Sequence, residues 1–157
     1  MIDDLDRIMA VMETAFEPHW GEAWNRRQVS DSLRFPNTYY RLVDQAGATP
    51  EGEMPAAGFT LVRAAPGEEE LLLIAVDPDC RGHGLGGELL RLFAEDARTR
   101  GAEKVFLEMR SNNPAQSLYL ANGFEPIGRR RDYLDHSLRP ARRLALVNSN
   151  GRTREEV

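Results

Sequence analysis

The chain has 157 residues, of which 41% are hydrophobic, and this length and composition indicate a single globular domain with a buried core. Its formal net charge of −5 argues against a nucleic-acid-binding protein, because such proteins are usually basic. The single cysteine, Cys80, cannot form an internal disulfide, and no stretch is apolar for long enough to span a membrane. The N-terminus is acidic, unlike that of a signal peptide. We therefore expect a cytoplasmic protein with no nucleic-acid or membrane partner.

The first third of the sequence predicts two helices and a strand. Apolar residues recur at helical spacing through Asp3–Phe16, and Asn25 can cap a second helix that ends near Phe35, before Pro36. The segment between them, Glu17–Ala23, is expected to be a loop. A strand is predicted at Tyr39–Val43.

The remainder predicts an alternation of strands and helices over residues 1–147, followed by a polar tail at 148–157. The expected strands are Ala57–Ala64, Glu69–Val76, Lys104–Met109, Phe124–Leu134 and Arg142–Val147, and the expected helices are Glu88–Arg100 and Pro114–Ala121. This order is typical of an α/β fold with a mixed sheet and helices on its faces.

A glycine-rich segment between the third strand and the third helix is the strongest functional signal. Asp77-Pro78 ends the strand, and four glycines follow at positions 82, 84, 86 and 87. Glycines let the backbone approach a ligand closely, and a helix N-terminus presents unpaired N–H groups and a positive dipole end to an anion. The segment therefore predicts a pyrophosphate-binding site.

Spacing alone leaves three interpretations of these glycines: a pyrophosphate site for another ligand, a dinucleotide-binding loop, and a turn that binds nothing. Gly82-x-Gly84-x-x-Gly87 fits the dinucleotide-binding pattern, with Glu108 about twenty residues further on. Against a dinucleotide, Asp77–Arg81 separates the glycines from their strand, and little chain follows to complete a doubly wound sheet. The sequence has no Gly-Lys-Ser/Thr, which excludes a nucleotide-hydrolysing P-loop. The third interpretation is a turn that binds nothing.

Two segments resemble a known family. Val76–Gly86, which reads VDPDCRGHGLG, is similar to the acetyl-CoA loop of the GNAT superfamily of N-acetyltransferases, and Leu107–Phe124 is similar to the strand and helix that follow it. With Trp24 and Arg129-Arg130, the chain most resembles the branch that acetylates the N-terminal alanine of a ribosomal protein (RimI-like). The resemblance covers most of residues 3–133 and implies a mostly antiparallel central sheet.

The resemblance implies acetyl-CoA as co-substrate and the N-terminal amine of a peptide or protein as acceptor. The backbone N–H groups of the glycine segment are expected to hold the pyrophosphate. By resemblance, Ile74–Val76 would present the thioester and Asn112 would contact CoA. The expected cofactor-binding residues are Ile74, Ala75, Val76, Arg81, Gly82, His83, Gly84, Leu85, Gly86, Gly87 and Asn112. No metal is expected, because His19 and His136 have no partner at a metal-ligand spacing.

Two residues are expected to carry the proton transfers. An ammonium must lose a proton before it can attack, and the leaving thiolate must gain one, so we assign Glu108 as general base and Tyr119 as general acid. The segment from Arg110 to Asn112 is one residue shorter than in the family. A one-residue slip would turn Glu108 to the other face of the sheet, leaving water, Glu69 or Glu70 as the base.

Two further expectations concern function and assembly. The alternatives to a peptide acceptor are a small-molecule amine, such as a polyamine or an antibiotic, and a non-catalytic CoA-binding module. The acceptor is expected between the 17–23 loop with its following helix and the strands near Tyr133. The family usually begins with a strand, whereas this sequence begins with a helix. We therefore expect the first strand to be missing or reduced and Tyr39–Val43 to form a sheet edge, which makes a homodimer possible.

Overall fold

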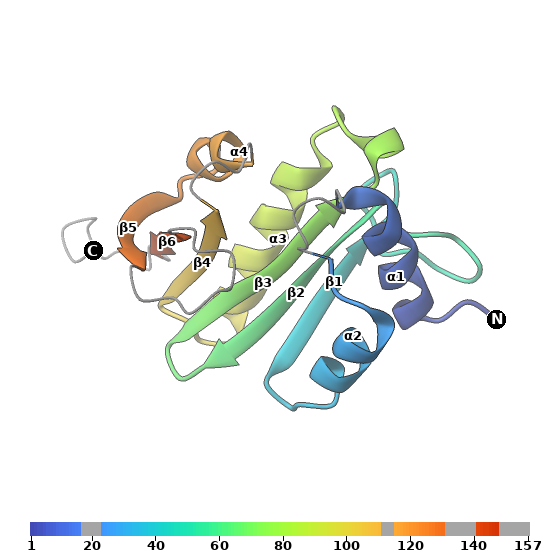
Figure 1. Cartoon of the computed structure of the whole chain (residues 1–157), viewed down its shortest axis with the longest axis horizontal. Helices are drawn as coiled ribbons and strands as arrows, with labels where there is room; N and C mark the ends of the chain where they lie inside the picture. The colour runs from blue at the N-terminus through green and yellow to red at the C-terminus, as the bar shows by residue number, and fades with distance from the viewer. Residues whose placement is uncertain (17–22, 111–114, 131–140, 148–157) are drawn as a thin grey trace.

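The computed structural model describes residues 1–16, 23–110, 115–130 and 141–147, with the backbone alone for 110, 127–130 and 141–147. The fold is a six-stranded sheet in the order β1-β2-β3-β4-β6-β5, with helices on both faces (Figure 1). The elements are α1 (Asp4–Ala15), α2 (Arg26–Leu33), β1 (Thr38–Val43), β2 (Gly58–Ala65), β3 (Glu68–Val76), the 3₁₀ helix η2 (Pro78–Cys80), α3 (Leu85–Thr99), β4 (Lys104–Arg110), α4 (Gln116–Ala121), β5 (Glu125–Arg130) and β6 (Ala141–Val147).

The sheet is mixed and mostly antiparallel, which confirms the predicted fold class. Within it β3 and β4 pair in parallel, while each of the other neighbouring pairs is antiparallel. The last strand in sequence, β6, lies between β4 and β5. The predicted strand Phe124–Leu134 is described as far as Arg130; Pro114, Asn112, the 17–22 loop and the 148–157 tail lie outside the described residues.

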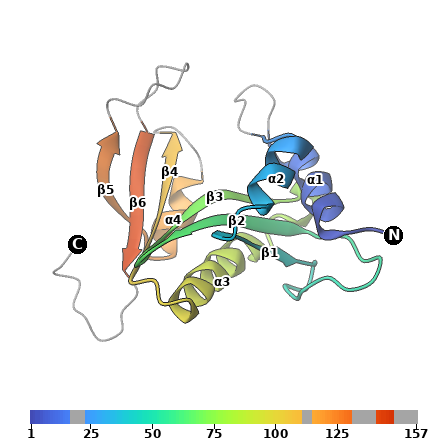
Figure 2. The ribbon, with the colours of Figure 1, turned by 90° about the horizontal axis from the view of Figure 1, so that it is seen from below.

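Helices α1 and α2 cover one face of the sheet (Figure 2). Both begin at a capping box, as Asp3 exchanges hydrogen bonds with Asp6 at 2.7 and 3.2 Å, and Asn25 with Gln28 at 2.8 Å each way. These reciprocal bonds satisfy backbone N–H groups that a helix start leaves unpaired. The apolar stripe of α1 packs on the sheet residues Phe59, Leu61, Leu73 and Ala75. Both predicted helices are confirmed.

Helix α3 covers the opposite face with a stripe of Leu89, Leu90, Phe93 and Ala97, all at most 1% exposed. The predicted start of this helix at Glu88 is wrong, because the helix begins at Leu85 and includes Gly86 and Gly87 in its first turn. Glycine is a poor helix former, so the sequence reads as a loop up to Glu88. The packing that admits these two glycines is described below.

In the part of the chain that the structure describes, strand β1 forms one end of the sheet and pairs with β2 alone, as expected for Tyr39–Val43. The first element of the described chain is α1, so the expected edge is present. Arg41 of β1 reaches α3, where its Nε and Nη2 donate to the Asp96 carboxylate at 3.0 and 2.9 Å. The homodimer that an open edge favours stays a prediction.

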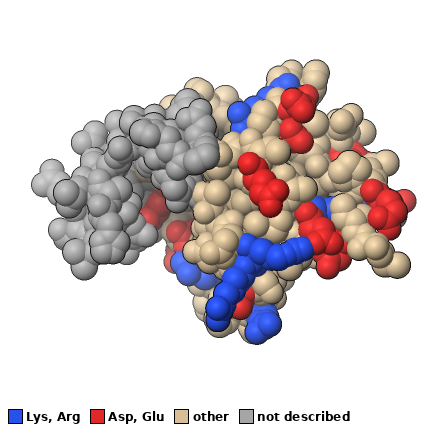
Figure 3. All heavy atoms as spheres, turned by 45° about the vertical axis from the view of Figure 1, so that its right-hand side comes forward, with Lys and Arg blue, Asp and Glu red and all other residues tan. Residues whose placement is uncertain are grey.

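Charged side chains of both signs share the face of the molecule that Figure 3 views. Figure 3 shows Asp and Glu in separate groups, with Lys and Arg between them, on the face it views. Among the described residues, none of the helices has the length and apolar character needed to cross a bilayer.

Candidate active site

The site is organised by the way β3 and β4 separate. Glu68–Leu71 of β3 is in register with Lys104–Leu107 of β4, and the parallel pairing stops there. Beyond that point β3 continues through Leu72–Val76, where β2 is its one ladder partner among the described strands. In Figure 1 the two strands start together and diverge toward their C-terminal ends. The divergence leaves one backbone edge of β3 open inside the sheet.

A β-bulge at Leu72 coincides with the start of this opening. Leu61 of β2 pairs with Leu73, and Val62 pairs with Leu71, so Leu72 is the extra residue. A bulge bends its strand and changes which face the following side chains occupy. Leu71 accordingly packs with α3, whereas Leu73 and Ala75 pack with α1. Sequence reasoning missed the bulge, because a continuous apolar run carries no signal for it.

The bulge also decides which backbone groups of β3 face the opening. Asp77 N donates to Ala57 O at 2.7 Å, which fixes the phase of the antiparallel ladder. Alternate residues bond to the same partner strand, so Ala75 bonds to β2, while Ile74 and Val76 turn their N–H and C=O groups toward the opening. Of the expected Ile74–Val76 segment, Ile74 therefore presents both backbone groups to the open edge, and Val76 presents its N–H, because Val76 O accepts from Arg81 Nε.

The glycine segment follows directly and makes a tight turn into α3. Asp77 caps η2 by accepting from Asp79 N at 3.0 Å. Gly82 and Gly84 have φ of +83° and +81°, a conformation that residues with a Cβ rarely adopt. Gly84 is the N-cap of α3 and supplies no capping side chain.

This turn leaves a row of backbone donors. Within the described residues, no hydrogen-bond acceptor pairs with the N–H groups of Gly82–Gly87, and the first helical donor in use is Glu88 N, which bonds Gly84 O at 3.0 Å. Consecutive donors at a helix N-terminus, with the dipole behind them, form an anion site. The donors and the open edge of β3 together fit the pyrophosphate and the extended arm of acetyl-CoA.

Arg81 lies at the head of the turn, and its side chain has two backbone partners. Its Nε donates to Val76 O at 3.2 Å and its Nη2 to Ala15 O at 2.8 Å. The guanidinium therefore joins the end of β3 to the end of α1. These contacts indicate that Arg81 positions the turn, in addition to any contact that it makes with CoA.

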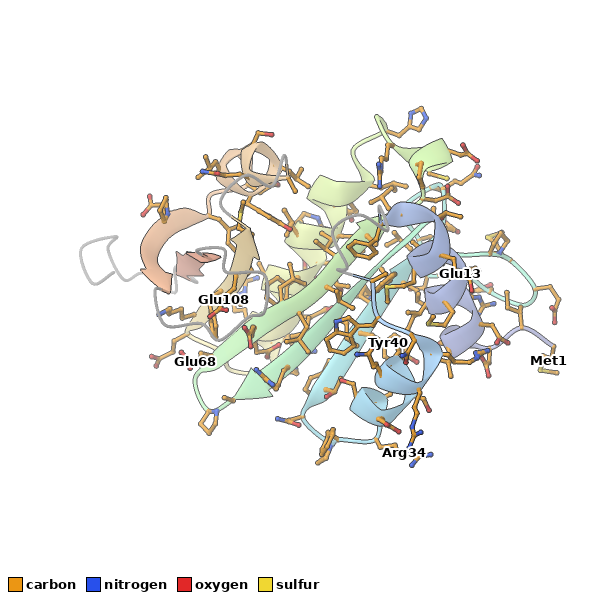
Figure 4. All side chains as sticks on the ribbon, in the orientation of Figure 1. Met1, Glu13, Arg34, Tyr40, Glu68 and Glu108 are labelled. Atoms are coloured by element: carbon orange, nitrogen blue, oxygen red, sulfur yellow. The ribbon has the colours of Figure 1, made fainter. Side chains whose placement is uncertain are left out.

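Glu108 lies on β4 beyond the paired segment (Figure 4). Its neighbours Leu107 and Met109 are buried against α3 and α4. Since side chains alternate along a strand, Glu108 projects from the opposite face, the one that α1 and α2 cover further along the sheet. It is half-buried there. Its Cα partner on β6 is Arg143.

The two alternative bases are both engaged in ion pairs. Glu69 is 2% exposed, and its carboxylate accepts from Arg100 at 2.6 and 3.0 Å on the α3 face. Glu70 accepts from Arg63 Nη2 at 2.6 Å. Each of these two carboxylates is therefore already occupied by a guanidinium.

Tyr119 lies on α4, which packs beside the first turn of α3. The residue is 6% exposed, and its ring centroid lies 6.1 Å from that of Phe124. The helix contacts α3 through Leu118, which touches Gly86, and through Asn122, which faces Gly87. The short helix therefore places Tyr119 close to the end of α3 that carries the backbone donors.

Three further residues of the predicted site are His83, Leu85 and Asn112. His83 is exposed within the turn, Leu85 is buried as the first residue of α3, and Asn112 lies outside the described residues. Cys80 is buried with a free thiol. Among the described residues, potential metal ligands do not gather in a group of three or more.

The fold separates the two ligand interpretations of the glycines. A dinucleotide-binding domain needs a doubly wound parallel sheet, whereas β3 and β4 are the one parallel pair of neighbours in this sheet. A strand that opens beside a donor-lined helix start instead suits a ligand with an extended arm and a pyrophosphate.

Comparisons with known proteins agree with this geometry. The model of the acetyltransferase (GNAT) family matches residues 5–124. The chain is 35% identical to N-alpha-acetyltransferase RimI of Mycobacterium tuberculosis over 114 residues, which are 71% of this chain and 68% of that protein. It is 37% identical to the ribosomal protein bS18-alanine N-acetyltransferase of Escherichia coli (strain K12) over 86 residues, which span 54% of this chain and 57% of that relative.

The fold is similar to a solved structure as well. The crystal structure of the ribosomal-protein-S18-alanine N-acetyltransferase from Escherichia coli superposes with a TM-score of 0.69 at 23% identity, covering 97% of this chain and 96% of that one. The family match extends from α1 to the residue before β5 and includes the opened strand, the glycine segment and α4. The chain therefore belongs to the GNAT family and is an acetyl-CoA-dependent N-acetyltransferase.

Proposed function

We propose that this acetyltransferase modifies the N-terminal α-amine of a protein or peptide that begins with alanine, by direct attack on acetyl-CoA. The observation that carries the proposal is the position of Glu108 beyond the paired part of β4, on the face opposite α3, beside a strand edge that can present a thioester. The names of the bS18-alanine N-acetyltransferase relatives support the choice of acceptor.

Acetyl-CoA is held by backbone groups in this proposal. The N–H groups of Gly82–Gly87 bind the pyrophosphate oxygens, and the pantetheine arm lies along the open edge of β3 as an added strand would. The N–H groups of Ile74 and Val76 face this edge; one of them donates to the thioester carbonyl and the other to the pantetheine arm. Donors fixed before the reaction stabilise the negative charge that develops on that oxygen.

The proton transfers follow the chemistry of the amine and the thiolate. The acceptor ammonium gives one proton to Glu108, and the free lone pair attacks the carbonyl carbon. Collapse of the tetrahedral adduct breaks the carbon–sulfur bond, and Tyr119 gives its hydroxyl proton to the departing CoA thiolate. The proton that the new amide nitrogen loses restores the Tyr119 hydroxyl through solvent. The enzyme thus returns to its starting state with one proton released.

An α-amine suits a carboxylate base better than a lysine side chain does. The α-amine has a pKa near 8, so roughly a tenth of it is uncharged at pH 7, whereas a lysine amine with a pKa near 10.4 is almost wholly protonated. A single general base can therefore supply the reactive form of an N-terminus at neutral pH. This argument supports an N-terminal acceptor over a polyamine.

The test is a panel of acceptors assayed with acetyl-CoA by thiol release and mass spectrometry. It contains a peptide that begins with alanine, the same sequence blocked at its N-terminus and carrying an internal lysine, spermidine, and an aminoglycoside. We expect acetylation of the free α-amine alone. Turnover of spermidine or the aminoglycoside with a higher kcat/KM than the peptide would overturn the proposed acceptor.

The acid role is tested separately with Tyr119→Phe. The phenylalanine ring keeps the contact with Phe124, so the fold and CoA binding should survive. We expect kcat to fall about 10- to 100-fold, because a general acid typically contributes a factor of this order or more. An unchanged kcat with every active acceptor would remove Tyr119 from the mechanism.

A further inference from the structure

Two of the four glycines in the glycine segment are not explained by backbone conformation. Gly82 and Gly84 have positive φ, whereas Gly86 and Gly87 lie in the first turn of α3 and do not. Glycine in a helix is unfavourable relative to alanine, because it loses more conformational freedom on folding. A second reason for glycine is therefore needed at these two positions, and helix α4 supplies one at Gly86.

Helix α4 lies against the bare backbone of this turn. A Cβ at Gly86 would come within 2.9 Å of Leu118 Cδ2, closer than side chains normally approach, whereas a Cβ at Gly87 would meet Asn122 Oδ1 at an ordinary 3.6 Å. Leu118 and Asn122 are four residues apart and share one face of α4. Asn122 Nδ2 also donates to Leu118 O at 2.8 Å, which fixes the end of the short helix.

The residue after Leu118 is the proposed acid. Leu118 packs between Gly86 and the edge of the apolar cluster that contains Tyr119 and Phe124. The contact between Leu118 and Gly86 thus sets the distance between α4 and the start of α3. It thereby also sets how far the Tyr119 side chain lies from the start of α3. A shift of about 1 Å in a reacting group can lower the rate about 100-fold.

We propose that Leu118 is a positioning residue, and that its packing contact with Gly86 fixes the position of Tyr119 relative to the acetyl-CoA held by the first turn of α3. The proposal rests on the proposed role of Tyr119. It predicts that Gly86 and Leu118 are coupled in kcat, the parameter that reports proton transfer to the leaving group. Binding of acetyl-CoA by the backbone N–H groups should be coupled to Leu118 far more weakly.

A double-mutant cycle tests this coupling. We expect Gly86→Ala and Leu118→Ala each to lower kcat about fivefold, because the first displaces Leu118 and the second removes it. The double variant should lose about fivefold as well, far less than the product of the two, because a smaller residue 118 leaves room for the new methyl group. The conservative single variant Leu118→Met should keep most of the activity of the unaltered enzyme, because a methionine side chain can fill the same space.

Gly87→Ala is the matched comparison, since it adds the same methyl group to the same helical turn. Its effect on kcat should multiply with that of Leu118→Ala. Two results together would overturn the proposal. Gly86→Ala would raise KM for acetyl-CoA as much as Gly87→Ala does, and its effect on kcat would multiply with that of Leu118→Ala. Gly86 would then be needed only for binding the pyrophosphate.

A Tyr119→Phe background separates this proposal from the proposed function. There Leu118→Ala should lower kcat no further, because the group that it positions is already gone. A further fivefold loss would show that Leu118 acts elsewhere, even if Tyr119 is the acid. Unfolding midpoints and CoA titration of each variant identify any loss of kcat that comes from an unstable fold.

Discussion

The carboxylate of Glu69 and the guanidinium of Arg100 form a two-point ion pair, with Nη2 at 2.6 Å and Nε at 3.0 Å from the two carboxylate oxygens. The pair joins the segment of β3 that is in register with β4 to the residue that ends α3. The Arg100 guanidinium also lies 4.0 Å from the ring centroid of Tyr39, on the edge strand. The buried carboxylate of Glu69 thus joins β3 to the C-terminal end of α3, which is the end that lies farthest from the backbone donors.

Glu69→Gln should destabilise the protein by about 3 kcal/mol, because it leaves a partly buried guanidinium without its counter-charge. Glu70→Gln is the control on the same strand, since its partner Arg63 has a side chain that is 58% exposed. An exposed pair of this kind contributes less than about 1 kcal/mol. Urea unfolding of both variants measures the difference, and equal losses would contradict the assignment.

Glu108→Gln should lower kcat/KM for an alanine peptide about 100-fold or more, because the amide cannot accept the proton of the ammonium. In the variant only an acceptor amine that is already uncharged can attack, so its rate should rise more steeply with pH than that of the unaltered enzyme. Glu68→Gln is a suitable control, because Glu68 is exposed at the paired end of β3 (Figure 4). A Glu108→Gln enzyme with an unchanged pH profile would point to water as the base.

Arg81→Lys should raise KM for acetyl-CoA about as much as Arg81→Gln does. A lysine keeps the charge but cannot bridge Val76 O and Ala15 O as the guanidinium does. We expect an increase of roughly tenfold in both variants, because each loses the two hydrogen bonds that join the turn to the ends of β3 and α1. If lysine preserves the KM while glutamine does not, Arg81 acts on phosphate through its charge.

Tyr40 should titrate late, and its contribution to stability should be lost over a narrow alkaline range of pH. Its hydroxyl donates to Asp4 Oδ2 at 2.7 Å, and desolvation, then this bond, raises the pKa of Tyr40 to about 12. A group whose pKa is raised on folding stabilises the protein below its unfolded pKa near 10, and this contribution is lost as pH rises toward 12. Unfolding between pH 9 and about 12 should show this slope, and Tyr40→Phe should remove it.

The sequence predicted what depends on local pattern. The stripe on α1 and the capping residues Asp3 and Asn25 are short-range signals, and both helices lie where the spacing places them. The glycine segment, too, was identified from residue types at fixed offsets. These features need no knowledge of distant parts of the chain.

What depends on contacts far apart in sequence could not be predicted. The start of α3 was placed three residues late, because nothing in the sequence shows that Leu118 would cover Gly86. The bulge at Leu72 lies in a run of leucines, where either face would accept the side chain. The partners of Arg81 are backbone carbonyls of two separate elements, and no spacing rule identifies them.

The short paired segment between β3 and β4 should also affect the hydrogen exchange of backbone amides. Four register pairs join the β1-β2-β3 half of the sheet to the β4-β6-β5 half. Backbone amides that face the opening, such as those of Ile74 and Val76, have no ladder partner there among the described strands, and they should exchange their protons with solvent quickly. Bound CoA would add a partner there, so slowed exchange at these two amides would report substrate binding directly.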